Sequence, residues 1–189
     1  MVFSFRKFAL LAVAGFLSFS ASAAEPAAVQ FSSFDLNAPD VRDVRGVRLN
    51  AIYGESGSVS GVDFTIGLSD LENLKGVSLS LLLGVSRVRN EFSGVGIGFA
   101  NLHEGQDTGI NIALLNLTNN VNGVNLGLAN VSSGDTVADV SFVNISKKSS
   151  FQLAWFNSTD EIRGVQIGLL NCAKNGFLPC FPLINFPKQ

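Results

Sequence analysis

The chain has 189 residues and a formal net charge of −2, from 13 Lys and Arg residues against 15 Asp and Glu residues. This mildly acidic balance, without a basic cluster, excludes the electrostatic footprint of a nucleic-acid-binding protein. One His and two Cys residues form no cluster with metal-ligand spacing, so we expect neither a metal nor another cofactor.

The N-terminus has the three-part layout of a secretory signal peptide. A short basic segment, residues 1–7, precedes an apolar run over residues 8–19, and Ala21-Ser22-Ala23 is a small-residue cleavage pattern. We therefore expect residues 1–23 to be removed on export. The expected location is the periplasm, the cell envelope or the cell surface, with the outer membrane as one candidate.

Residues 24–45 form a lead-in to the rest of the chain. The apolar residues of Val29-Gln30-Phe31 and Phe34-Asp35-Leu36 predict one extra strand, which Pro39 would end because proline has no amide hydrogen to donate.

Residues 46–189 form a β-repeat domain in which one octad recurs nine times at intervals of 13–18 residues. Counted from its first residue as position zero, positions 1, 3 and 5 are apolar, whereas positions 2 and 4 are small or polar. This alternation predicts strands with one apolar face. The nine octads begin at Gly46, Gly61, Gly76, Gly94, Gly109, Gly123, Val137, Ser150 and Gly164. Position 7 is Asn in the last six, namely Asn101, Asn116, Asn130, Asn144, Asn157 and Asn171.

Two all-β architectures fit this repeat. A strand of about eight residues spans roughly 26 Å, and the remaining six residues barely cover that distance back. This favours an antiparallel meander of about nine to eleven short strands that closes into a shallow barrel. A β-solenoid with stacked like positions is the alternative, and it would explain the Asn row. We expect the apolar face inside, because an apolar band roughly 13 Å high is too narrow for a bilayer.

The C-terminal Phe- and Pro-rich segment predicts a hairpin. Cys172 and Cys180 lie symmetrically about Gly176, and Asn175-Gly176 is a strong turn signal. A hairpin would bring the two sulfurs together as a disulfide, and the alternative is a pair of buried free thiols.

The octads at 123–130 and 164–171, together with the closing segment 176–186, resemble the uncharacterised bacterial "surface repeat" proteins. That family is exported or lipid-anchored and built from tandem copies of such octads. The resemblance implies an exported bacterial protein, and it carries no activity or site residues. The first three octads depart from the pattern, because they lack Asn at position 7.

No reactive set of side chains emerges from the sequence. His103 stands alone beside Glu104 and is expected to be a solvated loop residue, and Arg48 and Asp63 are expected to form an exposed pair across neighbouring strands. We therefore predict a non-enzymatic exported envelope or surface repeat protein, a scaffold or binding module for an unknown partner, with membrane contact at most peripheral. The alternatives are a carrier with an apolar ligand or lipid in the barrel interior, and an outer-membrane β-barrel pore.

Overall fold

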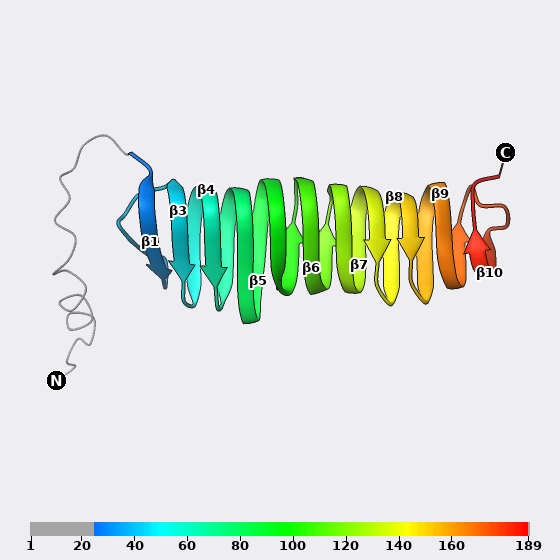
Figure 1. Cartoon of the computed structure of the whole chain (residues 1–189), viewed down its shortest axis with the longest axis horizontal. Helices are drawn as coiled ribbons and strands as arrows, with labels where there is room; N and C mark the ends of the chain where they lie inside the picture. Colours follow the sequence, from blue (N-terminus) through cyan, green and yellow to red (C-terminus); the bar gives the residue numbers. More distant parts are fainter. Residues whose placement is uncertain (1–24, 189) are drawn as a thin grey trace.

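The computed structural model describes residues 25–188, so the predicted signal peptide lies outside the described residues. The described chain is a β-solenoid without helices, a stack of coils whose strands form one sheet (Figure 1). The strands are β1 (Ala27–Ser33), β2 (Leu36–Ala38), β3 (Val44–Asn50), β4 (Tyr53–Thr65), β5 (Leu68–His103), β6 (Gln106–Thr118), β7 (Asn120–Val140), β8 (Val143–Leu153), β9 (Phe156–Ala173) and β10 (Cys180–Asn185).

Neighbouring coils pair in parallel, with like positions of the repeat side by side. Gly46 pairs with Gly61, and Gly109 pairs with Gly123. Asn130 pairs with Asn144 in the same way. The predicted antiparallel meander is therefore wrong, and the β-solenoid, the alternative, describes the fold.

The geometric argument for the meander fails because the octad does not run straight. The chain bends at residues 51–52, 66–67, 141–142 and 154–155, near positions 4 to 6 of the octads concerned. A bent octad brings its two ends closer than roughly 26 Å, so six residues suffice to close the coil. Those six residues are also paired strand, since β6 pairs with β7 from Gln106 to Thr118.

The first position of the octad requires glycine in the early coils. Gly109 has φ = 138°, a backbone conformation that residues with a side chain rarely adopt. A Cβ atom there would lie 1.9 Å from the carbonyl oxygen of Gly94 in the preceding coil. The recurrent glycine thus permits both the local conformation and the close stacking of one coil on the next.

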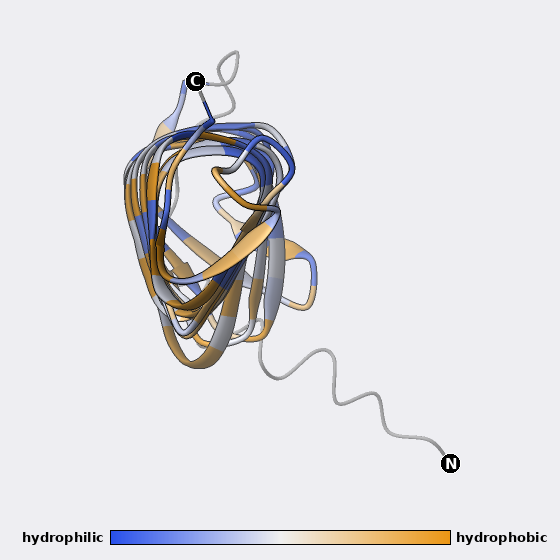
Figure 2. Cartoon of the chain, turned by 90° about the vertical axis from the view of Figure 1, so that its right-hand side faces the viewer, coloured by the Kyte–Doolittle hydropathy of each residue, from blue (hydrophilic) through white to orange (hydrophobic). Residues whose placement is uncertain are grey.

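The two faces of the octad are the reverse of the prediction. Position 2 points into the coil, where Asn111, Asn125 and Gln166 are fully buried, whereas the apolar side chain of Leu128 at position 5 is 49% exposed. Seen along the axis, hydrophobic residues gather at the lower turn of the coils and hydrophilic ones at the upper turn (Figure 2). The first coils also contain a small apolar core, which consists of Val44, Val59, Leu71, Leu74, Val88 and Phe92.

Stacked amides explain why a polar interior is stable. In the Asn row, each side-chain Nδ2 donates to the Oδ1 of the Asn in the next coil, over 2.7–3.0 Å from Asn101 to Asn171. Many of these amides also donate to backbone carbonyls, as Asn116 does to Leu126. Each amide therefore finds partners away from water, which removes most of the cost of its burial.

Both ends of the stack are covered by antiparallel pairing. β1 lies parallel to β3, and the segment expected to hold one extra strand forms β1 and the short β2, which pairs antiparallel with β1. At the other end β10 pairs antiparallel with β9, and Cys172 and Cys180 face each other in a disulfide with their Cα atoms 4.0 Å apart.

Candidate interaction surface

The most distinctive surface is an apolar ridge along the whole stack. We define it as the outward side chains at position 5, which form the crest, with position 3 on one flank and the apolar residues at position 8 on the other. The arrowheads of β3, β4 and β8 point to the lower turns in Figure 1, so the crest follows these turns. The crest residues that are most exposed are Ile66, Leu81, Phe99, Leu114, Leu128, Phe142, Trp155 and Leu169.

Exposed charges are absent from the described octads and hence from the ridge. Positions 0 to 8 of the nine repeats contain three charged residues, Arg48, Asp63 and Asp139, and each is buried inside the coil. The flanks are apolar as well: Ile97 and Ile112 at position 3 and Leu117 at position 8 are all about two-fifths exposed. Contiguous apolar surface of this extent marks an interaction site in soluble proteins.

One coil carries an apolar protrusion, which we call the Leu knob (Leu81–Leu83). Ser80 pairs with Thr65, and the amide of Val85 donates to the carbonyl of Gly67, so residues 81–84 lie where residues 66–67 lie in the preceding coil. Leu81, Leu82 and Leu83 project from the crest and are 52%, 82% and 72% exposed. This coil of β5 reaches lower than its neighbours in Figure 1.

Aromatic side chains form a second feature of the ridge. The rings of Phe142 and Trp155 meet edge to face with centroids 5.1 Å apart, and Trp155 is 64% exposed. With Leu126 and Val140 they border an open hollow of about 360 Å³ on the crest and its flank. Exposed Trp and Phe of this kind are common in surfaces that meet a partner or a membrane interface.

The opposite turn carries the exposed charges, mostly as ion pairs between coils that lie one or two repeats apart. Arg87 lies 2.5 Å from Glu104, Arg163 lies 2.9 Å from Asp135, and Arg42 pairs with Glu72. Exposed pairs of this kind contribute little to stability. Their effect is rather to make the solenoid amphipathic, with one charged edge and one uncharged ridge.

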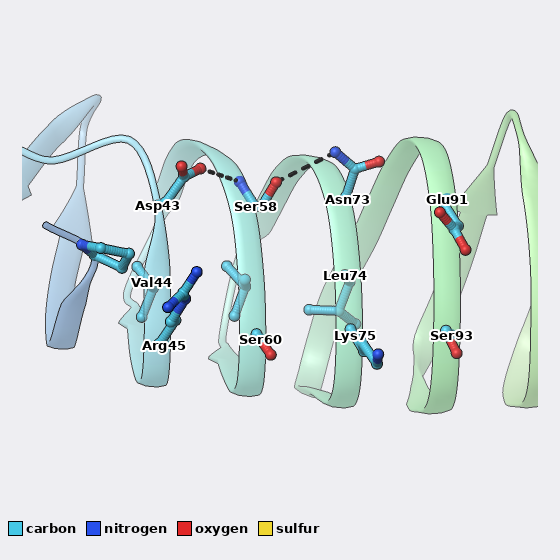
Figure 3. Close-up of a pocket in the computed structure, with 12 residues that line it drawn as sticks. Asp43, Val44, Arg45, Ser58, Ser60, Asn73, Leu74, Lys75, Glu91 and Ser93 are labelled. Carbon is cyan, nitrogen blue, oxygen red and sulfur yellow. Dashed lines mark hydrogen bonds between the residues drawn. The ribbon is translucent and has the colours of Figure 1, made fainter. Parts of the chain in front are cut away.

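A hollow of about 500 Å³ lies on the charged side of the first coils (Figure 3). The Oδ1 of Asp43 accepts a hydrogen bond from the amide of Ser58 over 3.0 Å, and Arg45, Lys75 and Glu91 lie along the border. Acidic and basic groups are balanced there, and no acid–base pair converges on one point. The hollow therefore indicates no particular ligand.

The two predicted exposed polar features are in fact buried. His103 lies inside the coil, not in a solvated loop: its Nδ1 is 2.7 Å from the Oδ2 of Asp107, and its ring packs on Phe92 with centroids 4.5 Å apart. Arg48 and Asp63 pair over 2.9 Å as expected, but both side chains are fully buried. Neither pair is accessible to a substrate, so we assign both to the stability of the coil.

A second ladder at position 2 was not found by sequence reasoning. Asn111 donates to Asn125 over 3.0 Å, and Asn125 donates to the Oδ1 of Asp139 over 2.9 Å. Burial raises the pKa of the Asp139 carboxyl above its ordinary value, against the opposing hydrogen bonds from Thr136 and Asn125. The alternation of the octad contained the signal, since polar residues recur at this position, but it was assigned to the outer face.

The remaining findings place few limits on function. No group of three or more potential metal ligands among His, Cys, Asp and Glu occurs within residues 25–188. The described part of the chain also has no helix that is long and apolar enough to cross a membrane. No family model matches the chain, and neither a curated protein nor a solved structure matches it.

Proposed function

We propose that this chain is a non-enzymatic, exported envelope or surface repeat protein that serves as a rigid binding module, and that the apolar ridge is its binding surface. The observation that carries the proposal is the absence of exposed charge from nine consecutive octads, beside an edge where charges are frequent. Exposure of such an apolar surface to water is unfavourable in free energy. A partner that covers the surface removes this cost.

The structure gives less support to the two alternatives. A carrier needs an apolar interior cavity for its ligand, and a pore needs a lumen. The described coils are instead filled, by packed apolar side chains in the first coils and mainly by Asn, Gln and Ser side chains in the later ones. The non-enzymatic character rests on the sequence pattern and on the inaccessibility of the His103–Asp107 pair.

The proposal is tested by the accessibility of the ridge in cells that make the protein. Leu128→Cys places a thiol on the crest, and the matched control Ser133→Cys places one on the exposed charged edge. Because the two native cysteines are disulfide-bonded, the new thiol is the only free one within the described residues. Both variants are treated with a membrane-impermeant thiol reagent, first in opened cells and then after purification.

We expect the thiol at position 128 to be protected in cells and reactive in the purified protein, whereas the thiol at position 133 reacts in both. Equal reactivity of position 128 in both settings would show that nothing covers the ridge, and it would overturn the proposed function.

A further inference from the structure

We propose that the partner that covers the apolar ridge is a lipid surface, into which the ridge inserts along its length. This inference rests on the proposed function, because it names the occupant of the same surface. A second copy of the chain and another protein are the competing occupants, and shape, charge and the Leu knob decide among them.

The shape of the ridge favours a deformable partner. The apolar surface continues around a turn of the chain, from Ile112 on one flank over Leu114 at the crest to Leu117 on the other flank. Two convex ridges of identical copies meet only along a line. Such a contact leaves both flanks of each ridge exposed, whereas a stable interface buries roughly 800 Å² per partner. A lipid surface contacts the crest and both flanks at once.

The distribution of charge agrees with insertion into the acyl region. An interfacial element buries its apolar side by about 5–10 Å and keeps its polar side in the headgroup region or in water. The ridge has no exposed charge in nine octads, whereas the ion-paired edge lies at the opposite turn of the coil. Because basic residues are absent from the ridge, insertion requires no anionic lipid, and zwitterionic lipid suffices.

The two protruding features fit the same geometry. The Leu knob extends beyond the crest, so it would hold a flat rigid partner away from the neighbouring coils but enters acyl chains readily. Trp155 lies on the crest in the eighth repeat, and Trp is enriched where membrane proteins meet the interface. The knob and Trp155 lie in the third and eighth repeats, about 24 Å apart along the stack for a spacing of roughly 4.8 Å per coil, so they anchor both halves of the ridge.

Trp155 also supplies the test, because it is the only tryptophan of the chain. The purified protein is mixed with phosphatidylcholine vesicles and separated by flotation, and the Trp155 emission is recorded with and without lipids that carry bromine on the acyl chains. We expect co-flotation, a shift of the emission to shorter wavelength, quenching by the brominated lipids, and no loss of binding in 1 M salt.

Variants locate the contact. Leu82→Asp removes the tip of the knob, and we expect the partition coefficient to fall by more than about tenfold, as burial of one large apolar side chain predicts. Ser133→Asp adds the same charge on the opposite edge and should leave partition unchanged. Leu82 is mostly exposed, so its replacement should not unfold the coil, which circular dichroism verifies.

Three results would overturn the inference. These are an unchanged Trp155 emission without flotation, binding that disappears in 1 M salt, and equal partition of the Leu82→Asp and wild-type proteins. If the protein fails to bind vesicles but sediments as a dimer or larger oligomer, the occupant is a second copy. In that case, protection of position 128 in cells still supports the proposed function. Failure of the lipid inference can therefore be distinguished from failure of the proposed function.

Discussion

Asn125→Asp is the perturbation that best probes the polar interior. Asn125 is fully buried, accepts a hydrogen bond from Asn111 and donates one to the Oδ1 of Asp139 over 2.9 Å. The substitution changes few atoms, but it replaces the donor to Asp139 by a second carboxyl group. If the octad had its polar face outside, as the sequence alone suggested, the change would be nearly neutral.

The magnitude follows from two terms. Loss of a hydrogen bond to a charged acceptor costs about 1.5–3 kcal/mol. The two neighbouring carboxyl groups cannot both ionise in the coil, so the introduced group must keep its proton, and each unit by which its pKa is raised costs about 1.4 kcal/mol at neutral pH. We therefore expect a loss of about 3–5 kcal/mol of unfolding free energy at pH 7.

The loss should depend on pH with a definite sign. A carboxyl group whose folded-state pKa is raised holds a proton that the unfolded chain has released, so stability falls as pH rises from about 4. The deficit of Asn125→Asp relative to the wild type should thus be larger at pH 7 than at pH 4.5.

Urea unfolding followed by far-ultraviolet circular dichroism, with the disulfide intact, measures both effects. Leu128→Asp on the exposed crest should cost about 1 kcal/mol or less, and Asn122→Asp on the exposed edge should change stability by less than about 0.5 kcal/mol. The same unfolding midpoint for Asn125→Asp and Asn122→Asp would refute the assignment of position 2 to the interior.

Three further predictions concern other parts of the solenoid. Asp139→Asn removes a buried carboxyl whose pKa is raised, so the variant should become more stable relative to the wild type as the pH rises from 4 to 7. If the two proteins differ in urea midpoint by the same amount over this range, the raised pKa of Asp139 does not affect stability. Gly109→Ala should lower the unfolding free energy by about 3 kcal/mol or more, since its Cβ would meet the Gly94 carbonyl. In Gly96→Ala the Cβ would lie no closer than 3.3 Å to a neighbour, so thermal melts should show a loss of less than about 1 kcal/mol. Deletion of Leu81–Leu83 restores a 15-residue repeat, and calorimetry should show a melting temperature at least equal to that of the wild type; a clearly lower value would show that the knob supports the coil.

The repeat itself was predictable from the sequence, because the octad and its glycine recur at nearly fixed spacing. The direction of pairing was also encoded, in the Asn row: identical amides at identical positions gain partners from in-register parallel stacking, as Asn116 and Asn130 do. An antiparallel meander would not align them. The Asn row indicates the architecture more directly than the length of a straight strand does, because the octad is bent.

The inward face was not predictable from alternation alone, because a period of two is the same for either orientation. The usual rule places Leu126 and Leu128 inside and Asn125 outside. The rule fails here because the buried polar side chains form hydrogen bonds with those of the neighbouring coils. The sequence of a single octad does not show these hydrogen bonds. The Leu knob was predictable only in part. The 18-residue spacing after Gly76 indicates an insertion, but leucines within an apolar octad do not indicate that the insertion protrudes.

Thiol accessibility along the two faces tests the central claim most directly, namely that the polar side of each octad is interior and the apolar side forms the outer ridge. Ser78→Cys substitutes a fully buried residue at position 2, and Leu128→Cys substitutes a half-exposed one at position 5. The purified variants react with a small charged thiol reagent at low protein concentration without lipid. We expect position 128 to react at nearly the rate of the urea-unfolded chain and position 78 to react only as fast as the chain unfolds. Fast labelling at position 78 with protection at position 128 would contradict the claim.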